Sequence, residues 1–135
     1  MVLFACVDEN YGMQFNNRRQ SRDRVVIEKM IELSADRRIW ADPCSVDLLA
    51  AFPQTIIDKD FIQKSTNDDC CFVESIELSQ YLKRFDEVVL FQWNRRYPAD
   101  LLFPVVQLKC DYQLIRTMDF EGNSHKCITM KVYKR

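Results

Sequence analysis

The most constraining feature of the sequence is an uninterrupted apolar run near its start, Val2–Val7. A strand with one solvent-facing side alternates apolar and polar side chains, whereas this run has no polar member, as in parallel strands covered on both faces. We therefore expect Val2–Val7 to be a buried strand at the centre of an α/β sheet. Because ligands of open α/β sheets bind beyond the carboxyl ends of the strands, the loop at 8–22 is expected to lie over any site.

Alternating helix and strand patterns follow this loop. Residues 25–34 place apolar side chains at helical spacing, with Ser21 or Asp23 available as N-cap. The pair Asp42-Pro43 is a helix-start signal and predicts a second helix over 44–51. The other predicted elements are strands at 37–41, 54–57, 70–74 and 87–93, a loop or single turn at 58–69, and a helix at 76–85.

The last third of the chain changes to strand-like alternation. Residues 105–117 alternate loosely, a turn-like Asp-Phe-Glu-Gly-Asn follows at 119–123, and residues 124–133 alternate again. Two long strands around a turn predict a C-terminal antiparallel hairpin. The whole pattern predicts one α/β domain, 1–135, with a mostly parallel central sheet flanked by helices.

Composition excludes several classes of protein. The chain has 135 residues, 47% of them hydrophobic and 29% charged, which is typical of a globular domain that forms its own core. The net charge of −1 still permits a local anion site, because arginines cluster at 18–24 and 95–96. Without Cys-x-x-Cys spacing, the six cysteines predict no metal site, and we interpret them as reduced core thiols. No apolar run approaches the ~20 residues of a membrane span and no signal segment is seen, so we expect a cytoplasmic protein without a membrane partner.

Short motifs are spread along the chain in a recognisable order. The first strand leads into Val7-Asp8 and then Gly12-Met13, the strand at 87–93 is followed by Asp100 and Phe103-Pro104, and Asn123-Ser124-His125 precedes the final strand. In these motifs and in its predicted layout the chain resembles dihydrofolate reductase. The resemblance spans nearly the whole sequence and implies that family's fold, with a pterin-like ligand.

The resemblance also implies roles for particular residues. Asp23 matches the acidic position at the start of the first helix, which in the family orients and helps to protonate the pterin ring. The family holds its dinucleotide phosphates with Gly-Arg-x-Thr at a helix N-terminus, where residues 41–45 here read Ala-Asp-Pro-Cys-Ser. Asp42 brings negative charge to the place of a phosphate, and Pro43 removes an N–H donor. The family's Gly-Gly segment over the cofactor is also missing, so we expect no working NADPH site.

One motif, Asn-Arg-Arg-x-x-x-Asp, occurs twice, at 17–23 and at 94–100. If the fold resembles the reductase, these loops are neighbours at the carboxyl edge of the sheet and their guanidinium groups converge. Arginine offers a planar fork of donors suited to phosphate or carboxylate, and aromatic rings can stack on a base or a pterin. The ligand-binding residues predicted in this way are Arg18, Arg19, Arg22, Arg95, Arg96, Trp93 and Tyr97. Alternatively, each arginine pairs with a local aspartate and only joins the two loops.

Three functions follow from these patterns. The first is a dihydrofolate-reductase-like domain without a working NADPH site that binds a small anionic or heterocyclic ligand through the arginine-rich loops. The second is an active pterin or folate reductase with altered cofactor use and Asp23 as its acid. The third is nucleic-acid binding through the paired loops, with an affinity that falls steeply with salt. His125, the only histidine, is expected to be a hydrogen-bonded structural residue rather than a catalytic base.

Overall fold

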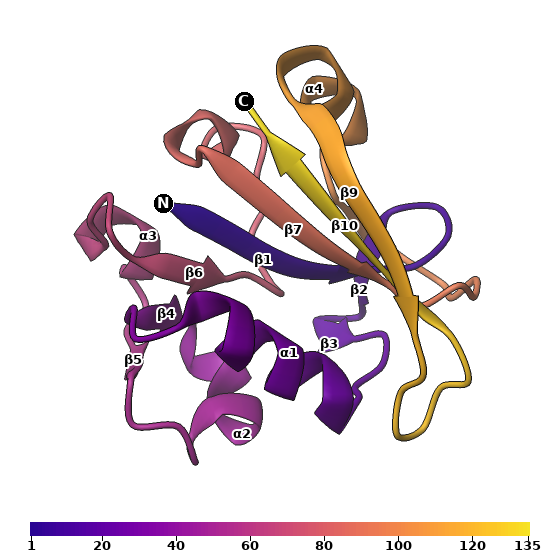
Figure 1. Ribbon diagram of the computed structural model, residues 1–135, viewed down its shortest axis with the longest axis horizontal. Coiled ribbons are helices and arrows are strands. Elements are labelled where there is room, and N and C mark those ends of the chain that lie inside the picture. Colours follow the sequence, from indigo (N-terminus) through magenta and orange to yellow (C-terminus); the bar gives the residue numbers. More distant parts are fainter.

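The computed structural model describes residues 1–135, and its main sheet has seven strands in the order β5-β4-β6-β1-β7-β10-β9 (Figure 1). Strand β1 (Val2–Val7) is the middle strand, and it pairs in parallel with β6 (Cys70–Phe72) and with β7 (Glu87–Gln92). Strands β4 (Ile39–Ala41) and β5 (Thr55–Ile57) extend the parallel part beyond β6. The central position predicted from the apolar run is confirmed.

Strand direction reverses beyond β7. Strand β10 (Ile128–Lys134) is antiparallel to β7, and β9 (Gln113–Phe120) is antiparallel to β10 and forms the edge of the sheet. The predicted C-terminal hairpin is confirmed. Its second strand begins at Ile128 rather than at residue 124, because the residues before it bind the start of the first helix, as described below.

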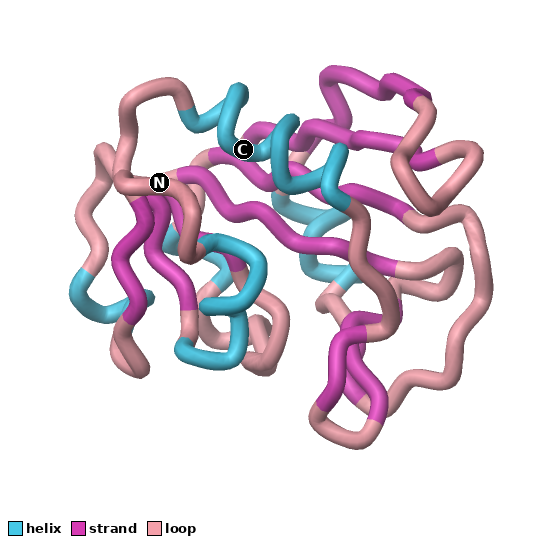
Figure 2. The backbone as a smooth tube through the Cα atoms, turned by 90° about the horizontal axis from the view of Figure 1, so that it is seen from below, coloured by secondary structure: helices cyan, strands magenta, loops and turns pink.

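Helices lie on both sides of the sheet (Figure 2). One face carries α1 (Arg24–Ser34) and α2 (Val46–Leu49), and the other carries α3 (Phe61–Lys64), the 3-10 turn η2 (Leu82–Arg84) and α4 (Val105–Asp111). The longest of these helices, α1, has 11 residues, and none is long and apolar enough to cross a bilayer.

Each face of the sheet has its own hydrophobic core. Along β1, Val2 and Phe4 enter the core beneath α1, whereas Leu3, Ala5 and Val7 enter the opposite core. Successive side chains of a strand point to opposite faces, and here both faces are covered. This double burial explains why the run has no polar member.

The segment predicted as a loop at 8–22 contributes two strands to a small second sheet. Strand β2 (Gly12–Phe15) pairs with β3 (Arg18–Arg19) on one side and with β8 (Leu101–Leu102) on the other. The prediction of an irregular loop is therefore wrong for these residues, although the segment does lie past the carboxyl end of β1, where it was expected.

Buried Asp8 fixes the path of the chain from β1 into this small sheet. Its carboxylate accepts hydrogen bonds from the N–H groups of Asn10 and Gly12, both at 2.8 Å, and from the side-chain amide of Gln20 at 3.0 Å. A Cβ atom on Gly12 would lie 2.6 Å from the Cβ of Ala99, so this close approach requires glycine.

The helix predicted at 44–51 is shorter than expected. It consists of a 3-10 turn, η1 (Pro43–Ser45), followed by the single turn α2. The predicted start signal is confirmed, because the Asp42 carboxylate accepts the N–H of Cys44 at 2.9 Å.

The helix predicted at 76–85 is wrong, since only η2 is helical there. The Glu77 carboxylate accepts both the N–H and the hydroxyl of Ser79, and such side-chain bonds compete with helix formation. Leu78, Leu82 and Phe85 are nevertheless fully buried. The apolar pattern therefore identified the buried side chains but not their backbone.

The strand predicted at 105–117 is wrong in its first half, which forms α4. Leu108 and Tyr112, four residues apart, both turn into the core. The Tyr112 hydroxyl lies within hydrogen-bond distance of two carbonyl oxygens, that of Leu82 at 2.7 Å and that of Phe85 at 2.6 Å. Because four residues are close to one helical turn, the two buried side chains fit a helix, and the loose alternation alone did not distinguish a helix from a strand.

The cysteines were interpreted as core thiols, which is wrong for half of them. Cys70 and Cys71 are buried and Cys6 is half-buried, but the other three, Cys44, Cys110 and Cys127, are exposed. All six are free, and burial raises the pKa of the Cys71 thiol to about 11. A thiol buried in this way is poorly reactive at neutral pH.

Asp69 ties the amino-terminal ends of the parallel strands together. Its buried carboxylate accepts two hydrogen bonds from Arg38, at 2.9 and 3.0 Å, one from the Trp40 ring at 2.9 Å and one from the Thr66 N–H at 2.8 Å. Burial alone would raise the pKa of Asp69, but these donors outweigh it and hold the pKa below its ordinary value.

This lowered pKa predicts a pH dependence of stability. The folded state binds fewer protons than the unfolded state, so the stability from Asp69 is present above the unfolded pKa of about 4 and is lost as the pH falls below it. We expect Asp69→Asn to lose less stability than the parent between about pH 6 and about pH 3. Urea unfolding at both pH values measures this, and an equal loss in the two proteins would contradict the assignment.

Candidate functional site

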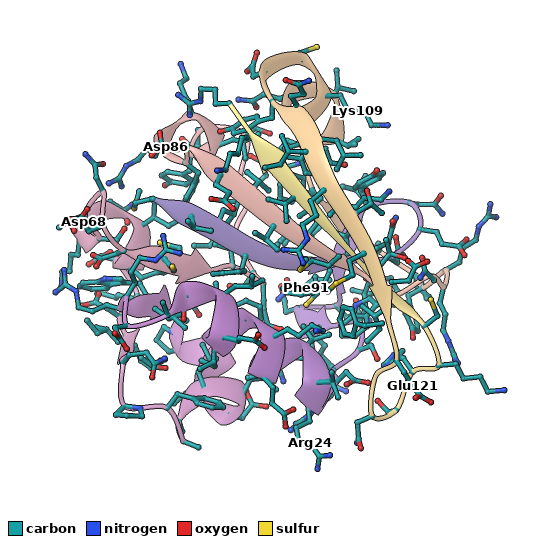
Figure 3. The ribbon with its side chains drawn as sticks, in the orientation of Figure 1. Arg24, Asp68, Asp86, Phe91, Lys109 and Glu121 are labelled. Atoms are coloured by element: carbon teal, nitrogen blue, oxygen red, sulfur yellow. The ribbon has the colours of Figure 1, made fainter.

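One pocket of the molecule lies where α1 begins. Its volume is about 450 Å³, within the range of small-molecule sites, and Ile27, Leu48 and Phe52 give it an apolar wall. The polar lining residues come from α1, α2 and the β9–β10 loop and are Arg22, Asp23, Arg24, Glu28, Asp47, Asn123 and Ser124. Figure 3 shows Arg24 at the start of α1 and Glu121 on the β9–β10 loop on the same side of the molecule. We call this cavity the α1 pocket.

Asp23 is both the N-cap of α1 and a residue of the pocket wall. Its buried carboxylate accepts the N–H groups of Val25 at 2.9 Å, Asn123 at 2.9 Å and Ser124 at 2.8 Å. A Cβ on Gly122 would lie 2.5 Å from this carboxylate, so the tight loop depends on that glycine. Burial raises the pKa of Asp23, but these N–H donors and His125 outweigh it and hold the pKa well below its ordinary value. The carboxylate is ionised at neutral pH, which makes it an acceptor and not a proton donor.

His125 connects Asp23 to the loop before the helix. Its Nδ1 lies 3.0 Å from Asp23 Oδ2, and its Nε2 lies 2.9 Å from the hydroxyl of Ser21. The imidazole is stacked on Trp93, with ring centroids 4.6 Å apart and an interplanar angle of 27°. Sequence reasoning gave His125 only a structural role, and no sequence signal places residue 125 beside residue 21.

A second, more polar pocket of about 370 Å³ is lined by Gln14, Asn17, Arg18, Arg19, Cys44 and Glu74, and we call it the β2–β3 pocket. Arg19 donates to Glu74 at 2.8 Å and to Asp47 at 2.8 Å. Glu74 is 8% exposed and also accepts the Ser45 hydroxyl at 2.7 Å. Since Asp47 lines the α1 pocket, this ion-pair network joins the linings of the two cavities.

The two Asn-Arg-Arg loops do meet, but through other groups than their guanidiniums. The N–H of Asn16 donates to Asp100 Oδ2 at 3.2 Å, and the Gln20 amide donates to the Pro98 carbonyl at 3.4 Å. Strands β2 and β8, which lie next to the two loops in the sequence, pair with each other and keep the loops close. Proximity of the loops was predicted, whereas these polar contacts were not.

The predicted ligand-binding arginines are dispersed instead of converging. Arg22 lines the α1 pocket, while Arg18 and Arg19 line the β2–β3 pocket. Arg95 and Arg96 line neither, and Arg96 lies 3.7 Å from the carboxylate of Glu9. Arg19 and Arg22 of the first loop meet at the Asp47 carboxylate, but the arginines of the second loop do not join them, so the expected convergence of the two loops is wrong.

The two predicted stacking residues also differ from expectation. Trp93 is 3% exposed and its ring faces His125, so it has no free face for a ligand. Tyr97 is half-buried against the core beneath α1, and its N–H donates to Asp8. Both side chains stabilise the loops around the site.

The strand order and the antiparallel edge are those of a dihydrofolate-reductase-like fold. Among solved structures, the dihydrofolate reductase from Enterococcus faecalis in complex with NADP(H) and RAB-propyl matches with a TM-score of 0.70, covering 99% of this chain and 95% of that one. The two sequences are 8% identical, so the comparison establishes the fold alone. No family model matches the sequence, and no curated protein matches it.

Residues 41–45 stand where the resemblance would place the phosphates of a dinucleotide. The Asp42 carboxylate already accepts the N–H of Cys44, and Pro43 has no N–H to donate. The following helix α2 is only four residues long. A phosphate site at a helix start needs free N–H groups and no fixed negative charge. These residues do not fit a dinucleotide phosphate. Nor does any group of three or more His, Cys, Asp or Glu side chains lie together as a metal site would require.

Proposed function

We propose that this chain is a ligand-binding domain that holds a small heterocyclic molecule with an anionic group in the α1 pocket, without NADPH. One observation carries the proposal: the α1 pocket combines an apolar wall with two arginine side chains at a single cavity of small-molecule size. Apolar walls with a few polar groups that fix orientation are typical of such sites.

The apolar wall suits a flat ring. Ile27 from α1 and Leu48 and Phe52 from the α2 region line the same cavity as the buried edge of Asp23. The carboxylates of Glu28 and Asp47 also line it and offer acceptors for amino substituents on that ring. An amino-substituted heterocycle therefore matches this wall better than a purely aliphatic ligand does.

The arginines suit an anionic tail because their present partners hold them weakly. Arg22 lies 3.5 Å from Asp47, and Arg24 lies 3.4 Å from Glu28, with 65% and 71% of their side chains exposed. Exposed pairs of this kind contribute about 0–1 kcal/mol, so a carboxylate or phosphate on the ligand can replace them at little cost.

Two features support binding without the dinucleotide. Residues 41–45 lack the donors that a phosphate needs, as shown above. In addition, Arg19 and Ser45 both donate to Glu74, so the arginine of the β2–β3 pocket already has an anionic partner there. A second function, reduction of a pterin with NADPH, is disfavoured on both grounds.

Folic acid is a suitable probe, because it joins an amino-substituted pteridine to two carboxylates. We expect it to raise the thermal midpoint of the protein, since a ligand present at 100 times its Kd adds about 2.7 kcal/mol to stability. Arg24→Ala is expected to weaken binding about tenfold, which is the loss of one charge-assisted contact. Isothermal titration calorimetry measures the affinity.

Arg95→Ala is the matched control, since Arg95 is exposed, has no ion-pair partner and lies outside both pockets. It should bind folic acid as the parent does. Equal weakening by Arg95→Ala and Arg24→Ala would contradict the assignment of the folic acid site to the α1 pocket. Absence of any response at millimolar folic acid overturns the ligand proposal. If the protein consumes NADPH in the presence of dihydrofolate, the proposal that it works without this cofactor is wrong.

A further inference from the structure

Ser21, His125 and Asp23 form a continuous hydrogen-bonded series of three side chains. The Ser21 hydroxyl lies 2.9 Å from His125 Nε2, and His125 Nδ1 lies 3.0 Å from Asp23 Oδ2. The members come from the segment before α1 and from the β9–β10 loop, so only the folded chain assembles them. This is the arrangement of nucleophile, base and orienting acid used in acyl transfer.

The surroundings decide the direction of each hydrogen bond. Asp23 is ionised and already accepts three backbone N–H groups, so it accepts a hydrogen from His125 as well. The Nδ1 atom of His125 therefore carries the proton, and Nε2 presents a lone pair to Ser21. This is the tautomer that a general base on a serine requires.

The imidazole is also held in a fixed orientation. It is 7% exposed, stacked on Trp93, and the Ser124 hydroxyl lies 3.1 Å from its Nδ1. Asp23 and Trp93 hold the ring in place before any reaction, so little further orientational entropy is lost when the ring accepts a proton. Ser21 itself is half-buried, so its hydroxyl is shielded but not enclosed.

The α1 pocket starts at the next residue in the chain. Arg22 and Asp23 both line it, as does Ser124 on the opposite loop. Ser21 itself does not line the cavity, but it precedes Arg22 in the chain and is joined through His125 to Asp23, and both of these residues line it. The half-buried hydroxyl is therefore next in sequence to the cavity wall.

We propose that Ser21 is a nucleophile, activated by His125 and oriented through Asp23, that accepts acyl groups from activated esters. Ser21 Oγ forms a bond to the ester carbonyl carbon while its proton passes to His125 Nε2. The bond from that carbon to the leaving oxygen breaks, and His125 returns the proton to the leaving alcohol. Water then attacks the acyl-serine with His125 again as base, which releases the carboxylic acid and restores Ser21. No oxidant, metal or cofactor enters this sequence.

A fluorophosphonate probe tests the first step in the intact protein. Ser21 Oγ displaces fluoride from phosphorus, and the bound group adds its mass to one peptide. We expect near-complete modification of Ser21 in the folded protein, no modification at this position in Ser21→Ala, and modification about 100-fold slower in His125→Gln, the size of a typical general-base contribution. Intact-protein and peptide mass spectrometry measure all three.

Ser79 is a control within the same molecule. It is exposed and its hydroxyl donates to the Glu77 carboxylate at 2.6 Å, but it has no imidazole partner. Selective labelling of Ser21 over Ser79 in the parent supports the proposal even if His125→Gln does not fold. An unlabelled parent, equal labelling of both serines, or an unchanged rate in a folded His125→Gln overturns it.

The result is separable from the ligand proposal. Ser21 is not among the residues that line the α1 pocket, so Ser21→Ala should bind folic acid as the parent does. If the parent binds folic acid but is not labelled, only the proposal of Ser21 as a nucleophile is overturned. If Ser21 is labelled but folic acid does not bind, only the ligand proposal is overturned.

Discussion

Asp23→Ala is expected to lower the free energy of unfolding by about 3–5 kcal/mol, because it removes a helix cap and also leaves buried donors without an acceptor. The N–H groups of Val25, Asn123 and Ser124 and the ring of His125 all point at its carboxylate. Loss of an N-cap alone costs about 1 kcal/mol, and each buried donor left unpaired costs about 1–3 kcal/mol unless water reaches it. Equilibrium unfolding in urea measures the change.

Asp36→Ala provides the control for this prediction. Asp36 is exposed just beyond the end of α1, and its side chain makes no hydrogen bond or ion pair. Its removal should change stability by no more than about 0.5 kcal/mol. A loss below about 1 kcal/mol in Asp23→Ala would mean that water replaces the carboxylate and that the loop at 121–125 is not held by it.

The second large effect is expected for Arg19→Ala, at about 3 kcal/mol. This change removes the charged partner of Glu74, which is 8% exposed and would be left as a buried, uncompensated carboxylate. Asp47 would lose its closest cation as well. Adding Glu74→Gln to Arg19→Ala should recover part of the stability, because it removes the isolated charge. A double-mutant cycle in urea measures this coupling.

Arg96→Ala is the matched surface variant. Arg96 lies 3.7 Å from Glu9 with 77% of its side chain exposed, so its removal should cost no more than about 0.5 kcal/mol. If Arg19→Ala is as mild as Arg96→Ala, then Glu74 is solvated in solution and the network between the two pockets is not a rigid wall.

The sequence predicted correctly those elements that have a strong local pattern of apolar residues. The run Val2–Val7 and the helix after Asp23 were correct, since each carries a strong periodic or continuous apolar signal. The segment at 76–85 carried the same kind of signal and failed, because Glu77 and Ser79 form a local turn that a helical pattern does not reveal. At 105–111 the sequence is compatible with both the strand period and the helical period, and the structure has a helix there.

The candidate site depends on contacts between residues about a hundred positions apart. Asp23 was identified as a site residue through the resemblance, but its bonds to residues 123–125 arise only when the β9–β10 loop closes over α1. The arginines were expected either to converge or to pair with an aspartate of their own loop. Arg19 and Arg96 instead pair with carboxylates that are distant in the sequence, those of Glu74, Asp47 and Glu9. The proximity of the two loops was predicted correctly. The positions of the guanidinium groups depend on ion pairs between side chains, which the sequence does not reveal.

The middle position of β1 affects how the chain reaches its folded state during synthesis. The two strands that flank it begin at residues 70 and 87, so the segment Val2–Val7 has no partner strand until these later residues have been made. At about 5–20 residues per second the ribosome leaves this segment unpaired for on the order of ten seconds. An exposed, uncharged apolar segment of six residues is prone to aggregate. Chaperone binding to the nascent amino-terminal segment is therefore expected to raise the yield of folded protein.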